Sequence, residues 1–141
     1  MKKYVVSICL CFLFLGCAVT EEVLNDPDAN CENRLCTLNF VLLTLTVEDA
    51  NGQPVILEDH QVIDKASNTD ITSRLDTQTF EKGTYTYYDD SMVRGNQNTV
   101  KTVVFKGFGA NQQLLFTEEY EVAIDCCHVA HLSGPRTIIL P

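Results

Sequence analysis

The chain has 141 residues, of which 19 are acidic and 10 are basic, so its formal net charge is −9. This length is typical of a single domain. The acidic balance excludes a nucleic-acid-binding surface, because such a surface needs clustered Lys and Arg side chains.

The first sixteen residues have the pattern of a bacterial signal peptide. Lys2 and Lys3 give a positively charged start, and the apolar run Tyr4 to Leu15 follows them. That run is too short for a membrane-spanning helix, which needs roughly 20 residues. We therefore expect residues 1–16 to be removed on export. Loss of the two lysines takes the formal charge of the remaining chain from −9 to −11.

The end of this segment, Phe14-Leu15-Gly16-Cys17, resembles a lipobox, the motif read by the lipoprotein signal peptidase. The resemblance implies that the Cys17 thiol receives diacylglycerol and that cleavage occurs before it. It also implies a protein held by lipid at the bacterial outer membrane, on its periplasmic side or exposed at the surface. Glu21-Glu22 resembles the acidic stretch of surface lipoproteins in Bacteroidota. An ordinary signal peptide is the alternative.

The cysteines predict a disulfide framework. Cys9 and Cys11 lie in the signal peptide, which leaves four cysteines besides Cys17 for an oxidising compartment. A bridge between the adjacent Cys126 and Cys127 would be strained. We therefore expect these two to be cross-linked to the N-terminal pair, with the choice of partners open. The four candidates are Cys31, Cys36, Cys126 and Cys127.

The chain divides into three parts by its pattern. Residues 1–16 are the signal peptide, residues 17–35 comprise the lipidated Cys17 and an acidic tether, and residues 36–141 are the domain. The domain shows short runs of strand-forming residues, separated by turn clusters such as 49–52 and 67–70, and shows no convincing helix. About seven strands of this kind predict an all-β sandwich. The strand-forming runs are 37–48, 55–57 followed by 61–65, 84–88, 100–108, 114–124, 126–132 and 137–140.

Alternation along these runs predicts which side chains form the core. Residues 100–108 have Val100, Val104 and Phe108 on one face and Val103 and Phe105 on the other. Residues 114–124 alternate in the manner of a half-exposed strand. The side chains expected to be buried between two sheets are Val41, Leu43, Leu45, Val104, Phe116, Tyr120 and Val122.

Three stretches resemble known families. Residues 47–55 (VEDANGQPV) and 82–86 (KGTYT) resemble carboxypeptidase-regulatory-like modules, which implies an Ig-like or transthyretin-like Greek-key sandwich. The end of the chain, at 125–129 and 133–135, resembles that of Bacteroidota lipoproteins. That second resemblance implies a fold and a location, and it implies no activity.

One stretch concentrates potential metal ligands. Cys126, Cys127, His128 and His131 lie within six positions of the chain, and these residue types bind zinc or copper. On a straight strand, however, Cys126 and His128 face one way while Cys127 and His131 face the other. Export also favours oxidation of the thiols over metal coordination. We therefore expect no metal or other cofactor, and cysteines in disulfides.

Other candidate chemistry is weaker still. Ser91, His128 and Asp90 form a triad only by free choice among the chain's residues. Tyr85, Tyr87 and Tyr88 could form an aromatic platform for a glycan, although aromatic residues on a strand more often pack in the core. The sequence thus predicts a non-catalytic, lipid-anchored envelope protein that serves as an adaptor or accessory domain for an envelope protein partner. The alternative is a ligand-binding module for a metal or a glycan.

Overall fold

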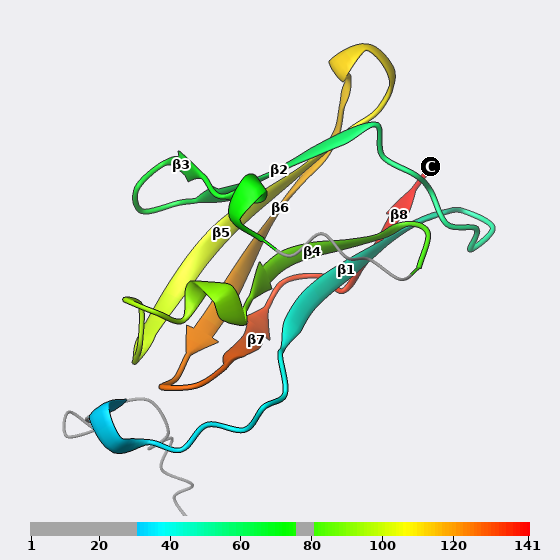
Figure 1. Cartoon of the computed structure of the whole chain (residues 1–141). Helices are drawn as coiled ribbons and strands as arrows, with labels where there is room; N and C mark the ends of the chain where they lie inside the picture. The colour runs from blue at the N-terminus through cyan, green and yellow to red at the C-terminus, as the bar shows by residue number, and fades with distance from the viewer. Residues whose placement is uncertain (1–30, 76–80) are drawn as a thin grey trace, which may run out of the picture.

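The computed structural model describes residues 31–75 and 81–141 (Figure 1). The expected signal peptide, the lipidated Cys17 and residues 18–30 of the tether lie outside the described residues. Within the described part, no helix is both long enough and apolar enough to cross a membrane. The helical turns there are short 3-10 segments: η1 (Cys31–Asn33), η2 (Thr72–Arg74), η3 (Asp90–Met92) and η4 (Ala110–Gln112).

The domain is an all-β sandwich, as the sequence predicts, with eight strands arranged in two layers (Figure 1). One sheet has three strands in the order β4-β1-β8, and the other has five in the order β3-β2-β5-β6-β7. The strands are β1 (Leu42–Asp49), β2 (Asp59–Asp64), β3 (Thr69–Asp70), β4 (Thr84–Asp89), β5 (Thr99–Phe108), β6 (Leu114–Ile124), β7 (Val129–Ser133) and β8 (Thr137–Leu140).

The three-stranded sheet joins the first strand to the last. β1 pairs antiparallel with β4 and parallel with β8. The register with β4 shifts between Leu43 and Thr44, whose partners are Tyr88 and Thr86, so that Tyr87 is the extra residue of a bulge. A bulge of this kind re-aims side chains. Both Tyr87 and Tyr88 are buried as a result, although neighbours on a regular strand point to opposite faces.

Most of the predicted core is confirmed. Leu43, Leu45, Tyr120 and Val122 are buried, and Val41 and Phe116 are partly buried against the same cluster. The prediction for Val104 is wrong, because β5 turns its opposite face inward.

The two faces of β5 show why periodicity misassigns this strand. The inward face carries the fully buried Val103 and Phe105, with Lys101 and Gly107 at its ends. The outward face carries more apolar residues in sequence, so a count of apolar positions favours the wrong side.

Two of the expected strand limits also change. Residues 37–41 precede β1 and belong to neither sheet, and residues 126–128 form a turn between β6 and β7. Residues 55–57 are not a strand, although Pro54 forms an isolated bridge with Glu48. In addition, the expected turn at 67–70 contains the two residues of β3, which pair with the end of β2.

Candidate functional site

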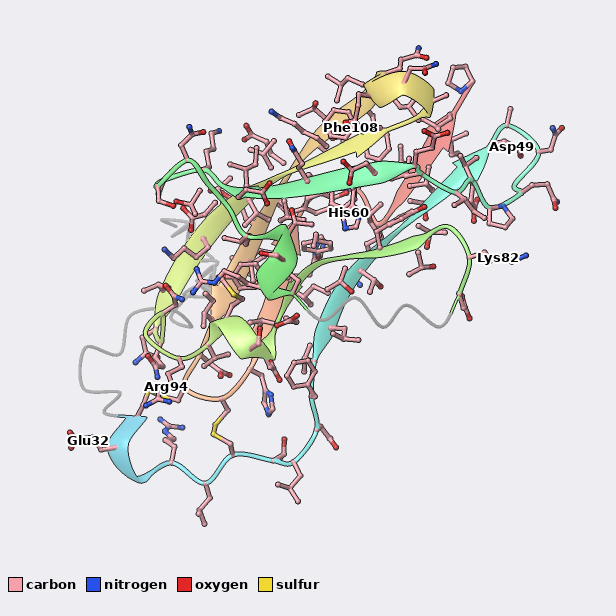
Figure 2. All side chains as sticks on the ribbon, turned by 45° about the horizontal axis from the view of Figure 1, so that its top comes forward. Glu32, Asp49, His60, Lys82, Arg94 and Phe108 are labelled. Carbon is pink, nitrogen blue, oxygen red and sulfur yellow. A yellow bond between two sulfur atoms is a disulfide. The ribbon has the colours of Figure 1, made fainter. Side chains whose placement is uncertain are left out.

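The segment from Cys31 to Val41, here called the arm, lies outside both sheets and runs beneath one end of the sandwich (Figure 1). Two disulfides attach it to the β6–β7 turn. Cys31 is bonded to Cys126 and Cys36 to Cys127, with S–S distances of 2.04 and 2.03 Å, and Figure 2 shows a sulfur–sulfur bond between the arm and the sandwich. The expected cross-link between the two cysteine pairs is therefore present. The sequence left open which cysteines pair, and the structure pairs Cys31 with Cys126 and Cys36 with Cys127.

The turn explains how two adjacent cysteines reach the same arm. Asp125 Oδ1 accepts hydrogen bonds from the backbone N–H groups of Cys127 and His128, at 2.6 and 2.7 Å. The Asp125 N–H in turn donates to the His128 carbonyl at 3.0 Å. This side-chain-stabilised turn replaces the strand expected over 126–128. The two cysteines therefore do not have to point to opposite faces of a sheet.

A chain of three side chains fastens the arm without covalent bonds. His128 Nδ1 lies 2.7 Å from Asp90 Oδ2, and His128 Nε2 lies 2.8 Å from Thr37 Oγ1. A carboxylate can only accept, so Nδ1 donates to it. When the ring is neutral, Nε2 accepts from the Thr37 hydroxyl. The Asp90 side chain is only 7% exposed, against 24% for His128.

Asp90 also holds the main chain on both sides of this link. Its Oδ2 accepts from the N–H of Val41 at 2.8 Å, and its Oδ1 accepts from the N–H of Val129 at 2.9 Å. The Asp90 N–H donates to the Val41 carbonyl at 3.1 Å. One carboxylate thus ties the end of the arm to the start of β7.

The order Thr–His–Asp is that of a nucleophilic triad, but its surroundings indicate a structural role. Both oxygens of Asp90 are engaged by backbone N–H groups. The nearby hollow of about 110 Å³ is lined by Arg34, Asn98, Asp125, Cys126 and Cys127, and its lining includes neither Thr37 nor His128. We interpret the three side chains as a fastening for the arm.

The residues considered from the sequence as metal ligands are engaged in other bonds in this structure. The sulfur atoms of Cys126 and Cys127 are used in disulfides and offer no thiolate. His128 is bonded through both ring nitrogens, and His131 Nδ1 lies 2.7 Å from the hydroxyl oxygen of Tyr87. Across residues 31–75 and 81–141, no three His, Cys, Asp or Glu side chains are grouped to hold a metal ion.

The tyrosines considered from the sequence as a glycan platform are also engaged within the domain. Tyr87 and Tyr88 are each 1% exposed, and burial raises the pKa of both to about 12. Tyr87 stacks on Tyr120 with ring centroids 4.2 Å apart. Tyr85 is half-buried, and its hydroxyl accepts from the Leu57 N–H at 2.6 Å. Three tyrosines engaged inside the domain present no flat surface to a sugar.

Replacing Asp90 with Asn should test the fastening. The Asn side chain has one acceptor oxygen and an NH₂ group, so it cannot accept from all three donors that now bond Asp90. An unpaired buried donor costs about 1–3 kcal/mol, and we expect Asp90→Asn to lower the free energy of unfolding by that amount in urea titrations. Asp59→Asn, at an exposed carboxylate, is the matched control. Equal losses in the two variants would contradict the role given to Asp90.

His60 should make stability depend on pH. Figure 2 shows it on β2, and its ring lies 5.4 Å from that of Phe105 and 5.3 Å from that of Tyr85. Burial lowers the pKa of His60 below its ordinary value of 6.5, against the opposing effect of Asp59 and Asp70.

The sign of the effect follows from proton binding. Below pH 6.5 the unfolded chain binds a proton at this position more readily than the folded one, so stability falls as pH decreases. His60→Phe keeps an aromatic ring and removes the titration. The free energy of unfolding, measured between pH 7 and pH 5, should then vary less steeply than in the unmodified protein. An unchanged slope would refute this assignment.

Sequence reasoning named the cysteines of this site, but it missed Thr37 and the role of Asp90. The comparisons with known proteins found no match: no family model, curated protein or solved structure matches the chain. The resemblances to Bacteroidota lipoproteins and to carboxypeptidase-regulatory-like modules therefore stay predictions.

Proposed function

We propose that this chain is a lipid-anchored, non-catalytic protein of the bacterial cell envelope, and that its sandwich acts as an adaptor or accessory interaction domain. The observation that carries the proposal is the doubly cross-linked arm. Disulfides persist in compartments outside the reducing cytosol, and two of them in one small domain support export. The cross-linked arm is also the segment that follows the proposed anchor at Cys17.

Rigid attachment of the arm suits a domain displayed from a membrane. Cys31 is the fourteenth residue after Cys17, and it is bonded to the β6–β7 turn. A force transmitted through the tether therefore acts on the disulfide-linked arm and the β6–β7 turn. The acidic side chains keep such a domain soluble near other envelope components.

The sheet edges offer places for a protein partner. β4 and β8 are the outer strands of the three-stranded sheet, and β3 and β7 are those of the five-stranded sheet. An outer strand can pair with an extended segment of another chain. Ile139 on β8 is 68% exposed, and it adds an apolar contact at one of these edges. We propose the β8 edge as the interaction surface of the adaptor.

The anchor is tested by replacing Cys17 with Ser in cells that receive labelled fatty acid. We expect Cys17→Ser to accumulate as unprocessed precursor without label, because the serine hydroxyl cannot replace the thiol that receives the lipid. Cys11→Ser, a cysteine of the signal peptide, is the matched control and should be labelled normally. Label in Cys17→Ser would refute the lipoprotein assignment.

The interaction surface is tested by chemical cross-linking in intact envelopes, followed by affinity isolation of the acylated protein. Ile139→Lys places a charge at the β8 edge, and we expect it to reduce the yield of the cross-linked partner several-fold. Leu114→Lys, also at an exposed apolar residue but on β6, is the control. An undiminished yield in Ile139→Lys would exclude this edge.

A further inference from the structure

The arm carries the most exposed apolar side chains of the described structure. Leu35 is 101% exposed and Leu38 is 103% exposed, while Phe40 is 54% exposed. No charged residue occurs from Leu35 to Val41. Three exposed large apolar side chains within six residues of one segment make it a candidate surface for contact with a protein or a membrane.

The cross-links explain why these leucines cannot withdraw into the core. Leu35 lies between the two bridged cysteines of the arm, so the chain on either side of it is fixed. Thr37 is held inward by His128 at 2.8 Å, and Leu38 directly follows it. The arm therefore makes inward contacts through Cys31, Cys36, Thr37 and Val41, and its leucines point to the solvent.

We propose that Leu35, Leu38 and Phe40 insert into the surface of the lipid bilayer to which Cys17 is anchored. This inference rests on the proposed acylation of Cys17. It adds a second contact with the membrane, made by the folded domain itself, and it fixes which end of the sandwich faces the lipid.

The length of the tether supports the bilayer as the partner of this surface. Thirteen residues, 18–30, separate Cys17 from Cys31. Whatever its conformation, a chain of that length spans at most about 50 Å. The proposed anchor at Cys17 therefore limits how far the arm can move from the bilayer. Because the anchor has already removed the cost of bringing the two together, even a weak apolar contact is favoured.

The distribution of charge supports the same orientation. The arm has one acidic residue, Glu32, and one basic residue, Arg34, so it is neutral overall. Residues 42–141 have 14 acidic and 7 basic side chains, a formal charge of −7. An anionic lipid surface repels that part of the domain, whereas it exerts no net electrostatic repulsion on the neutral arm. The arm itself therefore carries no net charge that would oppose contact with an anionic lipid surface.

A tryptophan reporter tests this contact directly, because the chain contains no Trp. Full-length acylated Leu38→Trp is reconstituted into phosphatidylcholine vesicles, with and without brominated phosphatidylcholine, which quenches tryptophan on contact. Leu114→Trp, at an exposed residue of β6, is the matched control. Both positions are exposed, so neither substitution disturbs the core.

We expect the emission of Leu38→Trp to shift to shorter wavelength and to be quenched several-fold more strongly by the brominated lipid than that of Leu114→Trp. Two results would overturn the inference. One is an emission wavelength of Leu38→Trp typical of a tryptophan side chain in water, and the other is a shifted emission that the brominated lipid does not quench. The second result would mean that protein covers the arm.

Fatty-acid content, measured by mass in the same samples, separates the two proposals. A chain without fatty acid refutes the anchor at Cys17. A chain with fatty acid whose Leu38→Trp emission stays that of water refutes only the docking of the arm.

Discussion

Removal of both disulfides is expected to lower the free energy of unfolding by about 5–7 kcal/mol, the largest effect of any change considered for this domain. The cross-linked residues are 95 and 91 positions apart. Closing a loop of that length is worth roughly 4–5 kcal/mol in the chain-entropy model. Once one bridge exists, the second closes a ring of only about six residues and adds about 2 kcal/mol.

The two contributions can be separated with paired substitutions. Cys36→Ser with Cys127→Ser leaves one long-range bridge, and we expect it to cost about 2 kcal/mol in urea titrations. The fourfold Cys→Ser variant should lose the full amount, and reduction of the unmodified protein should match it. If the fourfold variant is as stable as the unmodified protein, the cross-links do not stabilise this fold.

Truncation of Phe105 to Ala is the second large change, with an expected loss of about 3–5 kcal/mol. Phe105 is fully buried on β5. Its ring stacks on that of Phe116, with centroids 5.8 Å apart, and on that of His60, 5.4 Å apart. The aromatic contacts on both sides leave little room for the surrounding side chains to close the resulting cavity.

Two neighbouring variants make this prediction specific. Phe116→Ala should cost less than Phe105→Ala, because Phe116 is only partly buried, even though its ring covers Gly107 closely. Val104→Ala, on the outward face of the same strand, should cost less than about 1 kcal/mol. Equal losses for Val104→Ala and Phe105→Ala in urea titrations would mean that β5 turns its other face to the core.

The strands that the sequence predicts best are those whose pattern is local. The runs 84–88, 100–108 and 114–124 coincide closely with β4, β5 and β6. The run 37–48 includes β1, but its first half is equally apolar and lies in the arm. Apolar character alone does not distinguish a side chain that enters the core from one that is held outside it.

Of the candidate site, only the disulfides could be predicted from the sequence, because the chemistry of cysteine relates residues that are far apart in the chain. If the chain is exported as the sequence predicts, four cysteines need partners, and strain disfavours a bridge between adjacent ones. The cross-link between the two pairs is then the expected arrangement. The hydrogen bonds that join Thr37, His128 and Asp90 could not be predicted in this way. Thr37 lies 91 positions from His128, and His128 lies 38 positions from Asp90. No local spacing in the sequence relates these three residues before the fold brings them together.

The pairing of the first strand with the last affects how the protein is made. A ribosome produces Cys31 and Cys36 long before Cys126 and Cys127, and β1 long before β8. During that interval Cys31 and Cys36 lack their native partners, so any disulfide that either of them forms is non-native. Thiol–disulfide exchange must then replace it, on a scale of seconds to hours unless an isomerase assists. The supply of oxidoreductase, and not only the sequence, thus sets how fast the native molecule accumulates.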